Sequence, residues 1–150
     1  MRWTSKKFDA LSINELYEIM KLRVDVFVVE QDCPYPELDD YDQEAIHLYA
    51  VDDEKIVSYS RIIAPSVKYN QASIGRVITL PPYRRDGLGT ELINRSIEIA
   101  REEWPENDYI KIQAQAHLQR FYENCGFVVM SEEYLEDNIP HIDMIANINL

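Results

Sequence analysis

Residues 73–90 read SIGRVITLPPYRRDGLGT, and this stretch indicates a buried strand followed by a sharp turn into a helix. Its apolar first half, residues 73–80, is typical of a strand, and two consecutive prolines end that strand. Apolar residues at helical spacing then continue through Trp104, where a proline closes the helix. Residues 109–114 alternate in polarity, which predicts another strand. The order strand, helix, strand predicts a right-handed crossover between parallel strands.

The flanking segments predict that this crossover lies in the middle of a larger sheet. Ser12 and Glu15 have the spacing of a capping box, so we expect a first helix over residues 13–27. Two prolines and many carboxylates over residues 30–42 predict a long surface loop. Further strands are expected at residues 2–8, 47–51, 56–64, 127–130 and 141–148, the last two paired across a loop at 132–140, and a short helix at 118–124 capped by Gly126. We therefore predict an α/β fold in a single domain, residues 1–150, with a mixed, mostly antiparallel sheet flanked by helices and one central β-α-β crossover.

The composition is that of a globular domain. The chain has 150 residues, of which 46% are hydrophobic, and its apolar runs fall short of the roughly 20 residues that a membrane-spanning helix needs. Its N-terminus lacks the apolar segment of a secretory signal, so we expect a cytoplasmic protein with no membrane partner. Cys33 and Cys125 are the only cysteines, and neither has the spacing of a metal site. We expect free structural thiols and no metal.

The charge distribution is uneven. The net charge of −12 argues against a nucleic-acid partner, because phosphate binding needs clustered Lys and Arg. Residues 24–54 contain eleven acids and no Lys or Arg, which fits either a solvated face or a surface that attracts a cation. Arg61 and Arg76 interrupt apolar strands and therefore need partners. We expect the acidic loop to supply them; the alternative is that these arginines bind a substrate carboxylate.

The sequence RRDGLGT at residues 84–90 has the chemistry of a phosphate-binding turn. Glycines let a ligand approach the backbone, and the free N–H groups of a first helical turn attract anions. Arg84 and Arg85 would add charge-assisted contacts; the alternative is a glycine-rich helix cap with solvated arginines. A Walker A loop is absent, and Leu92 stands where the dinucleotide fingerprint needs a small residue.

The same turn resembles the Arg/Gln-x-x-Gly-x-Gly/Ala signature of the GNAT superfamily of acyl-CoA-dependent N-acetyltransferases. Residues 121–127, FYENCGF, are similar to the second motif of that superfamily. The resemblance extends to its ElaA subgroup at residues 27–35, 39–42, 113–118 and 139–142, and so covers practically the whole chain. Gln115 departs from the Asn that many members carry.

The resemblance implies a GNAT-like fold and direct transfer of an acetyl group from acetyl-CoA to a primary amine, without an acyl-enzyme. It implies that Tyr122 is the general acid that protonates the departing thiolate, whereas the residues alone favour a core aromatic. Candidates for the base are Glu30 and His117, with His47 and His141 as weaker ones. The residues implied to contact acetyl-CoA are Ile78, Thr79, Arg84, Arg85, Asp86, Gly87, Leu88, Gly89, Thr90, Gln115 and Tyr122.

The acceptor and the assembly stay open at this stage. The acidic stretch favours a cationic acceptor, such as a polyamine-like molecule or a lysine side chain. The alternatives to an enzyme are a non-catalytic acyl-CoA-binding sensor or interaction module, and a nucleotide-binding domain that uses the same glycine turn. The chain is expected to be a monomer or a homodimer, since apolar residues alternating over 142–148 fit either a dimer interface or burial within one chain.

Overall fold

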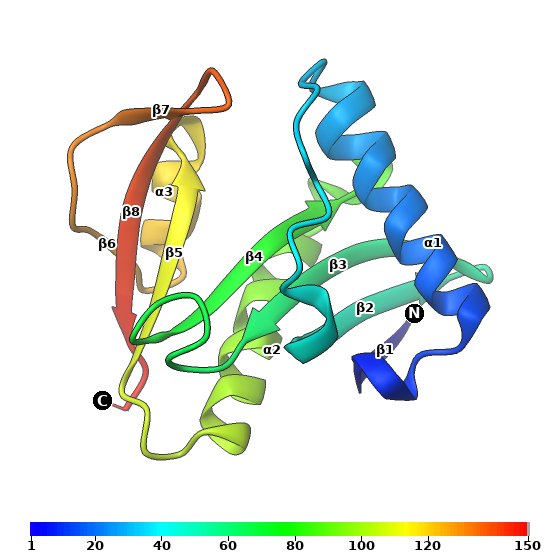
Figure 1. Ribbon diagram of the computed structural model, residues 1–150, viewed down its shortest axis with the longest axis horizontal. Coiled ribbons are helices and arrows are strands. Elements are labelled where there is room, and N and C mark those ends of the chain that lie inside the picture. Colours follow the sequence, from blue (N-terminus) through cyan, green and yellow to red (C-terminus); the bar gives the residue numbers. More distant parts are fainter. Residues whose placement is uncertain (150) are drawn as a thin grey trace.

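One eight-stranded sheet organises the structure, a computed structural model that describes residues 1–149 (Figure 1). The strands follow the order β1 (Arg2–Lys7), β2 (Ile46–Asp52), β3 (Lys55–Ile63), β4 (Ala72–Thr79), β5 (Tyr109–Gln115), β8 (Ile139–Asn147) and β6 (Val128–Val129), and β7 (Tyr134–Glu136) pairs with β8 beside that path. Among the strands of residues 1–149, only β4 and β5 are parallel, and the other pairs are antiparallel. The predicted mixed sheet with a central crossover is confirmed.

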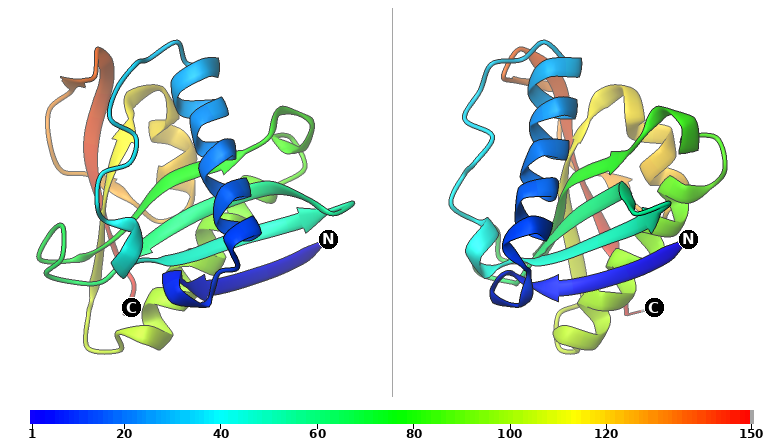
Figure 2. Two further views of the ribbon diagram at one scale, coloured as in Figure 1. Left: turned by 45° about the vertical axis from the view of Figure 1, so that its right-hand side comes forward. Right: turned by 90° about the vertical axis from the view of Figure 1, so that its right-hand side faces the viewer.

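Helices cover both faces of this sheet. Helix α1 (Ile13–Arg23) lies on one face, and α2 (Leu88–Glu103) and α3 (Gln119–Asn124) lie on the other (Figure 2). Short 3-10 turns occupy Phe8–Ala10, Asp42–Glu44, Pro81–Tyr83 and Ala116–Leu118. Within the described residues, none of the helices has both the length and the apolar character needed to cross a bilayer.

The start of α1 follows the predicted capping box. The N–H of Glu15 donates to Ser12 Oγ at 3.0 Å, and Glu15 Oε1 accepts from the Ser12 N–H at 2.8 Å. The C-terminal end of the helix differs from the prediction. Helix α1 ends at Arg23, and a π-helical segment, Val24–Glu30, follows it and extends past Phe27. There the N–H of Cys33 bonds to the carbonyl of Val28, five residues back, at 3.0 Å. The segment contains neither proline nor glycine, so its sequence does not mark where the α-helix ends.

Separate hydrophobic clusters fill the two sides of the sheet. On the α2 side, Leu92 and Ala100 pack with Ile110 and other buried residues. On the α1 side, Ile19 packs with Tyr59 and its neighbours. The alternating apolar residues of β8 and of the position that follows it are all buried within this one chain, at 4%, 0%, 4% and 3% exposure: Ile142, Met144, Ala146 and Ile148. This burial accounts for their alternation without a dimer interface.

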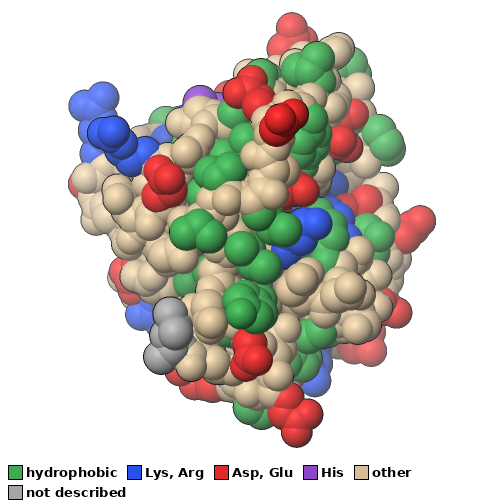
Figure 3. Space-filling model, turned by 90° about the vertical axis from the view of Figure 1, so that its left-hand side faces the viewer, with side chains coloured by type: hydrophobic (Ala, Val, Ile, Leu, Met, Phe, Trp, Pro, Cys, Tyr) green, Lys and Arg blue, Asp and Glu red, His purple; other side chains and the backbone are tan. Residues whose placement is uncertain are grey.

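The prediction of a loop over residues 132–140 is wrong in one respect, because this segment contains the strand β7. Strand β7 forms a hairpin with β8 across Asp137 and Asn138, which have φ values of 50° and 63°. Its sequence, YLE, is too short and too polar for a periodic signal. Val128 and Met130 beyond it are exposed. The side of the molecule that carries β6 and β8 shows hydrophobic side chains with acidic and basic ones scattered among them (Figure 3).

We expect that Ser12→Ala lowers the free energy of unfolding by about 1 kcal/mol, because it removes the acceptor for the Glu15 N–H at the start of α1. Urea denaturation followed by circular dichroism measures this change. Asn14→Ala, at an exposed position of the same helical turn, is the matched control. Equal stabilities of the two variants would contradict a structural role for the capping box.

Candidate active site

A cleft opens where the two parallel strands separate. Strands β4 and β5 pair only at Ala72 with Ile110 and at Ser73 with Lys111, and beyond these pairs they diverge (Figure 1). A cavity of about 990 Å³ lies along this divergence and is lined by both strands. The divergence therefore leaves one edge of β4 without a neighbouring strand.

A β-bulge bends β4 at the same place. Ile78 stands opposite Tyr59, whereas Gly75 stands opposite Arg61, so β4 has one residue more than β3 between these pairs. Arg76 in the bulge has a φ of 52°, a left-handed conformation that a residue with a side chain rarely adopts. The extra residue turns the second half of β4 away from β5.

The backbone of Thr79 belongs to the open edge of β4. The N–H of Leu80 donates to the Val57 carbonyl at 3.0 Å, so Leu80 is paired with β3. Neighbouring residues of a strand direct their backbone groups to opposite edges, so the groups of Thr79 point away from β3. The Thr79 carbonyl accepts there from Arg84 Nε at 2.7 Å. Ile78 carries its carbonyl on the β3 side, where Ser58 Oγ donates to it at 2.9 Å.

The residues predicted to contact acetyl-CoA fall into two groups. Six line the cleft, namely Ile78, Thr79, Arg84, Gly89, Gln115 and Tyr122. Five lie beside it, of which Arg85, Asp86, Gly87 and Thr90 are exposed and Leu88 is buried against Ala50 and Val57. The side chain of Leu88 is thus part of the core, and only its backbone is available to a ligand.

The turn into α2 presents free amides. Gly87 has a φ of 75°, which only glycine adopts without strain, and a Cβ on Gly89 would lie 3.4 Å from the Phe121 ring. The first N–H of α2 with a partner inside the helix is that of Glu91, which donates to the Gly87 carbonyl at 3.0 Å. The three amides of residues 88–90 remain free for an anion.

Tyr122 lies at the inner end of the cleft. It is 6% exposed, and its ring makes edge contacts with Phe121 and Phe127 at centroid distances of 5.0 and 6.0 Å. Burial raises the pKa of its phenol, so the hydroxyl stays protonated at neutral pH. Its hydroxyl forms no hydrogen bond with any residue in the range 1–149 and is available as a donor.

The candidate bases have different surroundings. Glu30 and His117 both line the cleft, and Glu30 pairs with Arg84 at 3.3 Å. His141 also lines it; its Nδ1 donates to the Ile139 carbonyl at 2.7 Å, which leaves Nε2 as a free acceptor. The proposal of His47 as a base is wrong, because His47 is fully buried between the Asp42 carbonyl and the Tyr59 hydroxyl. Its burial lowers the pKa of the imidazole.

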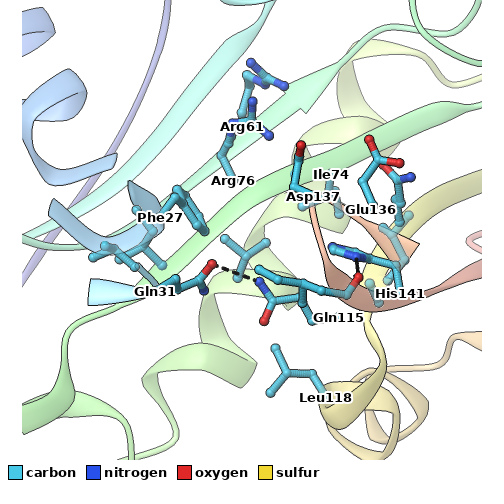
Figure 4. A pocket seen from close by; sticks show the side chains of 18 of the residues that line it. Phe27, Gln31, Arg61, Ile74, Arg76, Gln115, Leu118, Glu136, Asp137 and His141 are labelled. Atoms are coloured by element: carbon cyan, nitrogen blue, oxygen red, sulfur yellow. Dashed lines mark hydrogen bonds between the residues drawn. The ribbon is translucent and has the colours of Figure 1, made fainter. Parts of the chain in front are cut away.

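A hydrogen bond spans the cleft. Gln115 Nε2 on β5 donates to Gln31 Oε1, which follows the π-helical segment, at 3.3 Å (Figure 4). The same view places Phe27 beside Gln31, and Glu136 beside His141. Residues after α1 therefore form one wall of the cleft, and residues of the β7–β8 hairpin form another.

Six charged side chains, three of which also line the cleft, form a closed ring of alternating sign. Arg23 contacts Glu37 and Asp42 at 2.9 and 2.5 Å, Arg61 contacts Asp39 and Asp42 at 2.7 and 3.0 Å, and Arg76 contacts Asp39 at 3.1 Å and also pairs with Glu37. Arg23 and Arg61 are 0% and 1% exposed. Burial alone raises the pKa of Asp39, but Arg61 and Arg76 outweigh it and lower that pKa to about 2. The predicted pairing of Arg61 and Arg76 with the acidic loop is confirmed.

The ring changes the interpretation of the acidic stretch. Three of its eleven carboxylates neutralise three guanidinium groups, so they attract no ligand. Nor is the segment a plain surface loop, because Cys33, Glu37 and Asp42 are buried. The sequence did not lead us to predict a buried, paired role for Arg23. The signal was its spacing, because it lies four residues after Ile19 and three before Val26 on the buried face of the helix.

The sequence matches a protein family and a protein of similar size over nearly its full length. Residues 16–148 match the family described as acetyltransferase (GNAT) domain. Protein ElaA of Escherichia coli strain K12 is 35% identical over 150 residues, which cover 99% of this chain and 97% of that protein.

Solved structures agree with this match. A crystal structure of an acyl-CoA N-acyltransferase from Pseudomonas aeruginosa has a TM-score of 0.91 at 41% identity and covers 97% of this chain and 99% of that chain. The crystal structure of Escherichia coli ElaA also has a TM-score of 0.91, at 35% identity, with the same coverage. An aminoglycoside 6'-N-acetyltransferase complexed with coenzyme A shares the fold, with a TM-score of 0.73 at 15% identity over 97% of each chain.

We expect that Arg23→Met lowers the free energy of unfolding by about 3–5 kcal/mol, because it leaves Glu37 and Asp42 buried with one partner fewer each. Urea denaturation at neutral pH measures the loss. Lys21→Met, which removes an exposed ion pair from the same helix, is the matched control and should leave stability nearly unchanged. A stable Arg23→Met variant would show that the ring contributes little.

Proposed function

Because the chain belongs to the GNAT acetyltransferase family, we propose that it transfers an acetyl group from acetyl-CoA to the primary amine of a small molecule or peptide. One observation carries this proposal. The divergence of β4 and β5 brings an unpaired strand edge, the free amides of α2 and the hydroxyl of Tyr122 to one cleft. These are the groups that a long, amide-rich thioester with a diphosphate requires.

The chain offers a complementary group for each part of acetyl-CoA. The amides of residues 88–90 and the exposed side chain of Arg85 would bind the diphosphate. The open edge of β4 would bind the amide groups of the pantetheine arm as an added strand does. The Pseudomonas aeruginosa relative, described as an acyl-CoA N-acyltransferase, supports a CoA thioester as the donor.

The bound thioester supplies an activated acyl carbon, and the protein supplies the proton transfers. The acceptor nitrogen forms the new C–N bond to that carbon, and the C–S bond breaks. The open-edge N–H of Thr79 would donate to the thioester oxygen as it gains negative charge. Tyr122 would give its phenolic proton to the departing sulfur. Before it attacks, the acceptor ammonium would lose one proton to Glu30, His117 or His141, which all line the cleft, or to water. A second proton leaves the nitrogen as the amide forms and would restore the Tyr122 phenol through solvent, so the transfer releases one proton overall.

Isothermal titration with acetyl-CoA tests the proposal, followed by a panel of primary amines while free thiol is measured. We expect acetyl-CoA to bind with a dissociation constant on the order of micromolar and at least one amine to release thiol. Binding without thiol release from any amine would favour the non-catalytic sensor. Absence of binding would overturn the proposal, and competition by ATP or NAD would favour a nucleotide-binding domain.

Replacement of Tyr122 tests the general acid. We expect that Tyr122→Phe lowers kcat by roughly 10²-fold or more, because the thiolate then leaves without a proton donor. The dissociation constant of acetyl-CoA should stay within about twofold, because the ring and its packing are retained. Tyr109→Phe, which removes the hydroxyl of a half-exposed tyrosine outside the cleft, is the control. An unchanged kcat in Tyr122→Phe would remove Tyr122 from the mechanism.

A further inference from the structure

Two loops contribute charged side chains to the lining of the cavity in addition to those of the strands and the acidic loop. The connection between β3 and β4 contributes Lys68 and Tyr69, and the β7–β8 hairpin contributes Glu136 and Asp137. Cys33 Sγ donates to the Asp137 carbonyl at 3.3 Å, so the acidic loop contacts this hairpin. We call this part of the cavity the acceptor end.

Most charges that line the cleft are already neutralised. Arg61, Arg76 and Asp39 belong to the ion ring, and Arg84 pairs with Glu30. The charges left over are those of Lys68, Glu136 and Asp137, all at the acceptor end. Across residues 1–149, these three side chains take part in no ion pair of 4 Å or less. They bring one positive charge and two negative charges to the same cavity.

Lys68 is held in place without being neutralised. Its Nζ lies 5.5 Å from the ring centroid of Tyr41 and 5.5 Å from that of Tyr69. These contacts favour a cation but carry no net charge. Burial, together with the charges of Arg61 and Arg76, lowers the pKa of this ammonium. A half-buried cation in these surroundings gains most from an anion that enters the cavity.

We propose that the acceptor is a zwitterion, a primary amine that also carries a carboxylate, as a free amino acid or a short peptide does. Its carboxylate binds Lys68, and its ammonium group faces Glu136 and Asp137 before deprotonation. A single carboxylate matches the single free cation, whereas a doubly charged phosphate would leave excess negative charge next to two acids. This inference rests on the proposed acetyl transfer and replaces the purely cationic acceptor expected from the acidic stretch.

The test compares acceptors that differ only in the carboxylate. Free amino acids and dipeptides are assayed against their C-terminal amides, with spermidine as a polyamine, and thiol release gives kcat/KM. We expect the acids to exceed the matched amides by about tenfold or more. Lys68→Met should remove this preference by lowering kcat/KM for the acids about tenfold and leaving that for the amides unchanged. Lys55→Met, at the exposed first residue of β3, should keep the preference.

Each other outcome is decisive. Amides or spermidine that turn over as well as the acids overturn the zwitterionic acceptor and leave acetyl transfer standing. Equal losses for acids and amides in Lys68→Met, at unchanged acetyl-CoA affinity, assign Lys68 a structural role and also overturn the inference. Absence of acetyl-CoA binding to the unaltered protein overturns the proposed function and the inference together.

Discussion

The buried ring of three arginines and three carboxylates is the constraint on which the rest of the site depends. A guanidinium without a partner in the interior costs several kcal/mol, so each of these arginines requires its carboxylates. The ring joins α1 through Arg23, β3 through Arg61, β4 through Arg76 and the acidic loop through Glu37, Asp39 and Asp42. A loop with two prolines and no regular structure is thereby fixed over the sheet, where it forms one wall of the cleft.

The ring and the opening of the sheet are connected through Arg76. Its left-handed backbone costs about 1–3 kcal/mol, and the ion pairs to Glu37 and Asp39 hold the side chain that this conformation directs toward the loop. The bulge around Arg76 also bends β4 away from β5 and leaves the backbone of Thr79 directed to the open edge, where no strand pairs with it. One local irregularity therefore anchors the loop and exposes the strand edge.

The sequence predicts the parts of this structure that depend on neighbours along the chain. The capping box of α1, the β2–β3 hairpin, the central crossover and the glycine turn before α2 all follow from short-range patterns, and the structure contains them. For distant partners it predicts that Arg61 and Arg76 pair with the acidic loop, but it does not identify the individual contacts. The pairing of Arg23 with Glu37 and Asp42, the short strand β7 and the position of Lys68 between two tyrosines require segments that only folding brings together.

The contrast between short-range patterns and distant contacts also explains why the total charge of the chain does not predict the charge of the proposed acceptor. The part of the cleft proposed to bind acetyl-CoA is formed by backbone groups of β4 and α2, whose position follows from the fold, whereas the acceptor end is formed by side chains on loops. The net charge of −12 suggests attraction for cations, yet solvent and salt screen charges that lie far from the cavity. The ion ring adds three positive and three negative charges and sums to zero. The field that a ligand meets at the acceptor end is therefore set by Lys68, Glu136 and Asp137, so a molecule with both signs of charge fits there better than a polyamine.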